Sequence, residues 1–404
     1  MRIPFPLGLH LLPSKVRRLR MAPTMLAGAI LAAACSGPAS LVQQPGVASH
    51  GYGVTELIYG LERPWGMAFL PDGDILITER PGRVRLVRNG ELLPDPLEGG
   101  PTVWVGGQGG LLDIALHPDF PQTHFVYLSY SKEVEVTVGG TTETGITTAV
   151  ARARWDGESL QGLEDIFVAT PAMGTGRHFG SRLLFDRNGY LWITVGEMGL
   201  GAPAQDLGSH AGTTVRLFDD GGVPPDNPFA GEEAQQDGHL PEIFGYGHRN
   251  AQGLALHPGA GDIWLHEHGP RGGDAIHRVV PGGNYGWPDV SFGRQYTFFP
   301  IPDPEPGQGV ELPLHHWTPS IAPSGLAFYT GDRFPHWQGN LFAGALAGRH
   351  LRRVVFNGTE AVHEEVLLAE YGERIRDVRD GPDGYLYFLT DSEQGVMGRL
   401  EPSN

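Results

Sequence analysis

A pattern of two apolar runs around a tight turn recurs six times along this chain of 404 residues. Each copy has a short apolar run, a turn rich in Pro, Asp and Gly, and a second strand-like run such as ILIT, LWITV or YLYFLT. Two such runs around a tight turn are typical of a β-hairpin. The copies begin at Trp65, Gly110, Ser181, Gly253, Gly325 and Ile375.

The spacing of these copies indicates the architecture. The turns recur at intervals of roughly 45 to 75 residues, enough for a four-stranded unit and a loop of variable length. A solenoid is the alternative, but the mixed loop lengths and the lack of distinct capping repeats favour a closed ring. We therefore predict an all-β fold over residues 51–404, a six-bladed β-propeller with four-stranded antiparallel blades, whose long loops gather at one end of the central channel.

The net charge limits the partners. A formal net charge of −17 argues against nucleic acid and anionic membrane surfaces as partners. This overall charge still permits a local basic pocket for an anionic ligand.

The first residues of the chain are typical of a targeting segment. Residues 1–34 combine the basic run SKVRRLR with the apolar run MLAGAILAAA, which is too short to cross a bilayer, and predict a signal peptide. Cys35, the single cysteine, follows three alanines in a sequence that resembles a bacterial lipoprotein cleavage box, with ordinary cleavage after Ala34 as the alternative. Residues 35–50 predict a flexible tether. We expect an exported protein without a disulfide, periplasmic or anchored to the outer membrane through a lipid on Cys35.

Two polar motifs precede predicted inner strands. His178 lies in GRHFGSRLLF, and a neutral imidazole there could take a proton from an alcohol near neutral pH. Arg249 and Asn250 follow His248 in GYGHRNAQGLA and offer strong donors to a carbonyl or carboxylate. The structural alternatives are a hydrogen-bonded histidine and a surface turn.

The stretch LHEHGPRGGDAIHR permits three interpretations. His266 and His268 would share one face of a strand, which suits zinc, although no third ligand stands out. An irregular turn at Gly269 and Pro270, followed by Asp274, could aim backbone carbonyls at Ca²⁺. A turn without a metal is the third possibility.

Two arginines alternate near the C-terminus. Arg374 and Arg376 in ERIRDVRDGPDG share a strand face. They belong either to a salt-bridged strand or to a pair of donors that line the channel for a polyanionic ligand.

Taken in order, the motifs of this chain resemble the soluble PQQ-dependent aldose sugar dehydrogenases, a branch of the soluble quinoprotein glucose dehydrogenase family. The resemblance extends from about Gly53 to Leu400, and the family fold is a six-bladed propeller. The motifs that carry it are GGQGGLLDIALHPDF, RHFGSRL, GHRNAQGLA, EHGPRGGDAIH, NYGWP, IAPSGLAFY and RIRDVRDGPDG.

The resemblance implies a reaction and its catalytic residues. The family oxidises the C1 hydroxyl of an aldose to the lactone by hydride transfer to the C5 carbonyl of Ca²⁺-bound PQQ. His178 matches the general base that removes the hydroxyl proton, and Arg249 and Asn250 match the pair beside the quinone oxygens. The backbone carbonyls of Gly269 and Pro270 would hold the calcium ion.

The resemblance also assigns binding residues. Asp274 would belong to the metal site as support of its turn, and Arg374 and Arg376 would hold the cofactor carboxylates. Gln108 would contact both the cofactor and the sugar. His178, Arg249 and Asn250 would also contact the cofactor. Tyr285 and Trp317 are expected at the sugar, Trp317 as an aromatic wall. The expected partners are the aldose and an external electron acceptor, a quinone, a cytochrome or a dye, for a monomer or a homodimer.

Two positions depart from the family pattern. The family lysine on the cofactor is replaced by Ala347, and we expect Arg349 to supply the missing charge. Arg177 stands before the base where the glucose dehydrogenase branch has an acid, which leaves the preferred aldose open.

Two other functions fit a propeller of this size. A Ca²⁺-dependent sugar lactonase would need several carboxylates converging on one metal, and the two C-terminal arginines would then have no task. A non-catalytic sugar-binding propeller is compatible with the fold alone. The presence of His178, Arg249 and Asn250 together favours the dehydrogenase.

Overall fold

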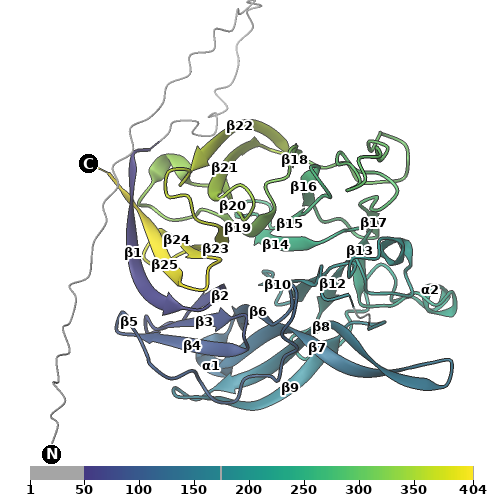
Figure 1. Ribbon diagram of the computed structural model, residues 1–404, viewed down its shortest axis with the longest axis horizontal. Helices are drawn as coiled ribbons and strands as arrows, with labels where there is room; N and C mark the ends of the chain where they lie inside the picture. Colours follow the sequence, from purple (N-terminus) through teal and green to yellow (C-terminus); the bar gives the residue numbers. More distant parts are fainter. Residues whose placement is uncertain (1–49, 173–174, 404) are drawn as a thin grey trace, which may run out of the picture.

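Six β-sheets surround a central axis in the computed structural model, which describes residues 50–172 and 175–403 (Figure 1). The sheets confirm the predicted six-bladed β-propeller with four-stranded antiparallel blades. The six hairpins of the sequence form the first two strands of the blades, with β2, β6, β10, β14, β19 and β23 innermost.

The strands of the first three blades follow one another along the chain. Blade one contains β2 (Pro64–Phe69), β3 (Ile75–Glu79), β4 (Arg83–Arg88) and β5 (Glu91–Leu92). Blade two contains β6 (Leu111–Leu116), β7 (Phe125–Val138), β8 (Thr141–Trp155) and β9 (Leu160–Val168). Blade three contains β10 (Gly180–Phe185), β11 (Leu191–Val195), β12 (Thr213–Leu217) and β13 (Ile243–Tyr246).

The last three blades contain the remaining strands. Blade four contains β14 (Ala251–Leu256), β15 (Ile263–Glu267), β16 (Asp274–Arg278) and β18 (His315–Trp317). Blade five contains β19 (Pro323–Phe328), β20 (Leu341–Ala345), β21 (His350–Asn357) and β22 (Glu360–Leu367). Blade six contains β23 (Ile375–Asp380), β24 (Leu386–Thr390), β25 (Gly395–Pro402) and β1 (Tyr52–Leu61).

Short elements lie in the loops. They are the helices α1 (Phe120–Thr123) and α2 (Glu232–Gln236) and the 3₁₀ turns η1 (Ala202–Gln205) and η2 (Pro335–Trp337). The short strand β17 (Gly283–Asn284) joins blade three in parallel to β13, although it follows β16 of blade four. It therefore ties the loop after β16 to the neighbouring blade. In the described part of the chain, no helix is long and apolar enough to cross a membrane.

The ring is closed by the first described strand. β1 pairs antiparallel with β25, from Tyr52 opposite Pro402 to Leu61 opposite Gly395, and the two strands lie side by side in Figure 1. This pairing joins the two ends of the described chain in one blade and makes β1 the outermost strand of that blade. The predicted signal peptide at residues 1–34 and the tether at residues 35–49 lie outside the described residues.

Apolar side chains fill the space between neighbouring blades. Leu76 and Leu86 of blade one pack in one buried cluster with Leu111 and Val126 of blade two. Similar clusters join the other blades, because β-branched and aliphatic residues alternate along these strands and meet between stacked sheets.

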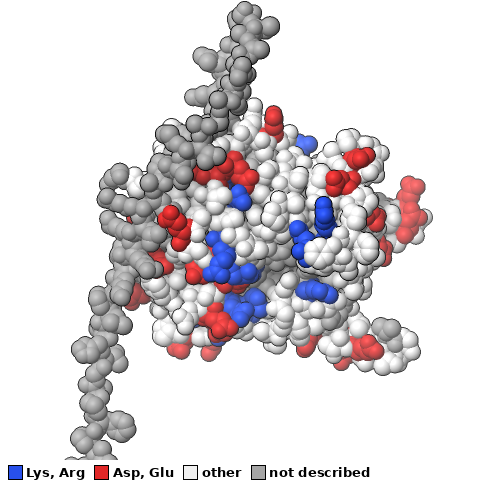
Figure 2. Space-filling model, turned by 45° about the horizontal axis from the view of Figure 1, so that its top comes forward, with Lys and Arg blue, Asp and Glu red and all other residues white. Residues whose placement is uncertain are grey.

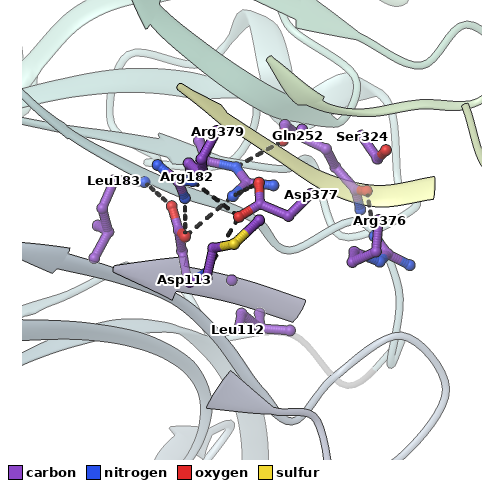
Figure 3. A network of polar contacts seen from close by, with 12 residues as sticks. Leu112, Asp113, Arg182, Leu183, Gln252, Ser324, Arg376, Asp377 and Arg379 are labelled. Carbon is purple, nitrogen blue, oxygen red and sulfur yellow. Dashed lines mark hydrogen bonds and ion pairs between the residues drawn. The ribbon is translucent and has the colours of Figure 1, made fainter. Parts of the chain in front are cut away.

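A buried ion network occupies the centre of the ring (Figure 3). Arg182 of β10 donates from Nη1 to Asp113 of β6 at 3.0 Å and to Asp377 of β23 at 2.9 Å. Arg379 donates to the same two carboxylates at 2.7 and 2.8 Å. Since each carboxylate also accepts a backbone N–H, from Leu183 or Met67, the network joins the inner strands of four blades.

Two further contacts extend the network. Arg182 donates from Nε to the backbone oxygen of Gln252 in β14 at 2.9 Å, and its guanidinium stacks 4.3 Å from the Trp65 ring. Arg376 donates to the Gln252 side chain at 2.9 Å. The inner strand of blade four is thereby attached to the same centre.

We predict that Asp377→Asn destabilises the fold by about 3 to 5 kcal/mol, because it leaves Arg182 and Arg379 with an incomplete set of buried counter-charges. Urea unfolding followed by fluorescence measures the free energy of unfolding. Asp119→Asn, at an exposed position, is the control and should stay within about 0.5 kcal/mol of the parent. Equal midpoints for the two variants would contradict this role of the network.

Candidate functional site

A cavity of about 670 Å³ opens beside the central network and is lined by charged side chains. Its charged lining residues are Arg63, Arg80, Arg374, Arg376, Asp391 and Glu393, with four positive and two negative charges. Basic side chains also gather around the hollow in the middle of the face shown in Figure 2, on a protein that is acidic overall. This lining suits an anionic ligand.

The predicted base forms a buried pair next to this cavity. His178 Nδ1 lies 2.7 Å from Glu197 Oε1, and both side chains are almost fully buried. The second carboxylate oxygen of Glu197 accepts the N–H groups of Leu200 at 2.6 Å and Gly201 at 3.2 Å. With its lone pairs occupied in this way, Glu197 fixes the imidazole in one orientation.

Burial and neighbouring charges keep His178 neutral. Burial lowers the pKa of His178 below its usual 6.5, Arg249 and Arg177 lower it further, and Glu197 opposes them. Burial raises the pKa of Glu197, but the hydrogen bond and charge of His178, the Gly201 N–H and the charge of Arg249 together outweigh this and leave the pKa below the ordinary value. A neutral imidazole beside an ionised carboxylate is the state required of a general base.

Arg249 is held on both sides of its backbone. Its N–H donates to Glu267 Oε2 at 2.6 Å, and its carbonyl accepts the N–H of Glu197 at 3.0 Å. Its guanidinium donates to the carbonyls of His268 at 3.2 Å and Gly269 at 3.3 Å and to the Tyr296 hydroxyl at 3.4 Å. These contacts restrict the Arg249 side chain to few conformations.

Gln108 and Asn250 join the base to its surroundings. The Gln108 side chain lines the cavity and accepts the backbone N–H of His178 at 2.8 Å. Asn250 Oδ1 accepts the backbone N–H of Gly180 at 3.1 Å. The structure therefore brings His178, Arg249, Asn250 and Gln108 together, as predicted.

The two C-terminal arginines meet at one carboxylate. Arg374 and Arg376 both donate to Asp391 Oδ2, at 2.8 and 3.1 Å, and both line the cavity. Burial raises the pKa of Asp391, but the guanidinium groups of Arg376, Arg374 and Arg80 together outweigh it, and the pKa lies below its ordinary value. The arginines are thus salt-bridged, as the first interpretation expected, and they also line the cavity, which leaves the second interpretation open.

Several buried donors near the cavity have no protein partner. Among the described residues, Nε of Arg80, Nε of Arg376 and Nδ2 of Asn250 are buried without a hydrogen bond. An unsatisfied buried donor costs about 1 to 3 kcal/mol, so such atoms at one site point to a ligand that accepts hydrogen bonds.

The turn after β15 is compact and depends on glycine. A Cβ on Gly269 would lie 2.1 Å from the Gly272 oxygen, so that only glycine fits. Asp274 accepts hydrogen bonds from the N–H of Gly269 at 2.8 Å and, across the blade interface, from Ser320, Ile321 and Ala322. The Asp274 carboxylate therefore supports the turn. Because its oxygens accept these hydrogen bonds, its contribution to a metal site would be to hold the turn rather than to bind the ion directly.

The three histidines of this stretch do not converge on one point. His266 and His268 contact the carbonyls of Gly325 and Pro323 in blade five, whereas His277 Nε2 lies 3.3 Å from Glu267. No group of three His, Cys, Asp or Glu side chains suited to a metal occurs in residues 50–172 and 175–403. The zinc interpretation is wrong.

The structure places the two aromatic residues expected at the sugar elsewhere. Trp317 is 5% exposed on the outermost strand of blade four, and its indole N–H donates to Glu364 of blade five at 2.7 Å. Tyr285 is 6% exposed, stacks on His248 with ring centroids 4.2 Å apart, and donates its hydroxyl to the Arg278 carbonyl. Trp317 therefore offers no surface to a sugar. Tyr285 does line a pocket with Arg249 and Gly269, but its volume of about 30 Å³ is too small for a sugar ring.

Arg349 is also outside the cavity. Its Nε donates to the Gly372 carbonyl at 2.6 Å and its side chain is 56% exposed, 3.9 Å from Glu373. The left-handed backbone at this position, with φ of 53°, breaks the strand alternation on which the expected orientation depended. The expectation that Arg349 replaces the family lysine at the cavity is therefore wrong.

Sequence reasoning missed Glu197, Glu267 and Asp391. Glu197 could have been found from the hairpin register, because Gly180 pairs with Val195 and the residues two positions beyond each are His178 and Glu197. Glu267 and Asp391 lie at or just after strands that the sequence predicted, but their partners come from other strands and loops.

The fold and the site together define a class of protein. An imidazole fixed by a carboxylate, next to an arginine-lined cavity at the centre of a six-bladed β-propeller, is typical of a propeller enzyme whose site suits an anionic ligand.

Comparison with known proteins specifies the family. The profile of the family described as Glucose / Sorbosone dehydrogenase matches residues 61–399, so the chain belongs to this family. Aldose sugar dehydrogenase YliI of Escherichia coli (strain K12) is 44% identical over 347 residues, covering 85% of this chain and 91% of that protein. As a member of this family, the protein is a sugar oxidoreductase.

Solved structures agree. The soluble aldose sugar dehydrogenase of Escherichia coli in the apo-form has a TM-score of 0.81 at 44% identity, covering 87% of this chain and all of that chain, 100%. The PQQ-bound form of aldose sugar dehydrogenase from Streptomyces coelicolor has a TM-score of 0.68 at 28% identity, covering 87% of this chain and 98% of that chain.

We predict that Glu197→Gln lowers the pKa of His178 further, because the parent carboxylate is the group that opposes the effect of burial. The acid limb of the pH profile of kcat/KM for sugar oxidation, and an NMR titration of the imidazole, should both shift to lower pH. Glu98→Gln, at an exposed position, is the control. A limb that stays in place or moves to higher pH would contradict the assignment of His178 as base.

Proposed function

We propose that this protein is a PQQ-dependent aldose sugar dehydrogenase that oxidises the C1 hydroxyl of an aldose to the lactone, with His178 as general base. The observation that carries the proposal is the arginine-lined cavity beside the buried His178–Glu197 pair. The names of the relatives support it, since one is an aldose sugar dehydrogenase with PQQ bound.

The residues at the cavity fit the chemistry of PQQ, which carries three carboxylates on an ortho-quinone. Arg374, Arg376 and Arg80 would hold the carboxylates, and the free Nε atoms of Arg80 and Arg376 are donors that such a ligand would satisfy. The Arg249 guanidinium and the free Nδ2 of Asn250 would face the quinone oxygens. A cavity of about 670 Å³ is within the ordinary range for a cofactor site.

The backbone carbonyls of Gly269 and Pro270 would hold Ca²⁺, a hard cation that prefers oxygen ligands. The Arg249 guanidinium, which donates to the Gly269 oxygen at 3.3 Å, would have to give up that contact when the ion binds. The tight turn, closed by Asp274, keeps these carbonyls in place without a side-chain ligand. When bound, PQQ accepts the hydride equivalent from the sugar, and Ca²⁺ polarises the quinone carbonyl.

His178 moves the proton. Glu197 accepts the hydrogen bond of Nδ1–H, so the lone pair of the neutral imidazole lies on Nε2, where it can accept the proton of the C1 hydroxyl. Glu197 then stabilises the imidazolium that forms. Arg249, clamped by Glu197 and Glu267, places a positive charge where negative charge develops.

The two other functions receive less support from the site. A lactonase would need several carboxylates around one metal, whereas Asp113 and Asp377 at the centre of the channel are paired with arginines. A purely sugar-binding propeller would not need a carboxylate-oriented imidazole.

We further propose that the protein is exported and passes its electrons to an external quinone, cytochrome or dye, as a monomer or a homodimer. Export and the lipid on Cys35 rest on the sequence of residues 1–35, outside the described residues.

We predict that the purified apoprotein oxidises aldoses with a dye acceptor only when PQQ and Ca²⁺ are both added, because both groups act at the same site. A panel of aldoses then identifies the preferred sugar. His178→Ala should lose turnover but retain PQQ binding in calorimetry, since the imidazole serves the proton rather than the cofactor carboxylates. The absence of any gain on addition of both groups would refute the proposed function.

We predict that Arg376→Ala weakens PQQ binding by about ten- to a hundredfold, the worth of a charge-assisted hydrogen bond. Arg374→Ala, at a more exposed position, provides a second measurement if Arg376→Ala folds poorly. Arg349→Ala is the control and should change the affinity by less than about twofold, because this side chain is exposed outside the cavity. If calorimetric titrations showed a larger loss of PQQ affinity for Arg349→Ala than for Arg376→Ala, Arg349 would be the residue that binds the cofactor.

A further inference from the structure

The most exposed large apolar side chains of the described residues gather at the site. Phe299, Tyr296 and Phe298 are 71%, 65% and 64% exposed, followed by Val105 at 54% and Leu200 at 50%. Clusters of exposed apolar side chains of this kind mark binding surfaces.

All five side chains lie on loops that also carry site residues or contact them. Val105 precedes Gln108 by three residues in the chain, and the N–H of Leu200 donates to Glu197 at 2.6 Å. The Tyr296 hydroxyl accepts a hydrogen bond from Arg249 Nη2 at 3.4 Å. This apolar rim therefore borders the site rather than a remote surface.

The three aromatic rings are held by a small hairpin at residues 294–300. Arg294 bridges to Pro300, the Gln295 N–H donates to the Phe299 carbonyl at 3.0 Å, and the Phe298 N–H donates back to the Gln295 carbonyl at 2.8 Å. The Arg271 guanidinium lies 4.0 Å from the centre of the Phe298 ring. The hairpin thus presents the rings to solvent next to Arg271, whose guanidinium can donate to hydroxyls.

The position of the base decides which part of a sugar could meet these rings. His178 is only 8% exposed, so a sugar must enter with its C1 hydroxyl foremost. Further units of an oligosaccharide are linked through other carbons of the reacting ring and must project towards solvent. The apolar face of a sugar ring stacks on aromatic side chains, while neighbouring arginines bind its hydroxyls.

We propose that the hairpin at residues 294–300 is a binding subsite for the second sugar unit of a reducing oligosaccharide whose first unit is oxidised at C1. This inference rests on the proposed function for the substrate that enters the cavity. It places the aromatic platform on Tyr296, Phe298 and Phe299 instead of the buried Trp317.

The test compares glucose with maltose and maltotriose in the PQQ- and Ca²⁺-loaded protein. In the double variant Phe298→Gly, Phe299→Ala, the ratio of kcat/KM for maltose to that for glucose should fall about threefold to tenfold, through a higher KM for maltose. Glycine at 298 tolerates the left-handed backbone there, with φ of 68°. Phe218→Ala, an exposed phenylalanine on another loop, is the matched control and should keep the parent ratio.

Each result has a consequence for the subsite. The subsite proposal is overturned if the ratio is unchanged or if both sugars lose equally. It is also overturned if only the KM of the dye acceptor changes, which would instead indicate that the acceptor docks at the hairpin. If the loaded parent protein oxidises no aldose of the panel, the proposed function fails, and calorimetric titration with maltotriose still tests the subsite. Weaker maltotriose binding in the double variant than in Phe218→Ala supports the subsite in that case, and equal binding overturns it.

Discussion

The paired buried charges of Asp113, Arg182, Asp377 and Arg379 connect the inner strands on which the site is built. Charges in a dry interior are stable only when their partners and hydrogen bonds are complete, so this network requires the strands to meet in one arrangement. Arg376 is adjacent to Asp377 on β23, at a register irregularity between Ile375 and Asp377, and it lines the cavity and donates to Gln252. The charge pairing in the channel and the lining of the cavity therefore share neighbouring residues of one strand.

A second set of contacts acts on the catalytic turn itself. The Glu197 carboxylate accepts a hydrogen bond from His178, and the Glu197 N–H donates to the Arg249 carbonyl. Glu267 accepts the Arg249 N–H and is in turn bonded by His248 at 3.0 Å and His277 at 3.3 Å. Burial raises the pKa of Glu267, but the two histidines outweigh it and keep the carboxyl ionised. The Glu267 carboxylate and the Glu197 backbone N–H thus hold the backbone of Arg249 before any ligand binds, which is the preorganisation that electrostatic catalysis requires.

The aromatic hairpin, the cavity and the base form a graded site. Charged donors lie at the cavity, a neutral imidazole lies buried beside it, and exposed aromatic rings lie at the rim. The order matches the chemistry proposed for each layer, since an anionic cofactor, a reacting hydroxyl and the apolar faces of sugar units require different environments.

The sequence by itself determined the six hairpins, the all-β ring and most of the site, because turn residues and strand periodicity are local properties, and because motifs such as GRHFGSRL and GHRNAQGLA stand next to inner strands. It also predicted that Arg374 and Arg376 share a face. Only the tertiary structure decided that Trp317 and Tyr285 are buried, that Arg349 turns away from the cavity, and that Glu197, Glu267 and Asp391 complete the site. The physical reason is that burial and charge pairing depend on contacts between strands and loops far apart in the chain, which no local pattern records.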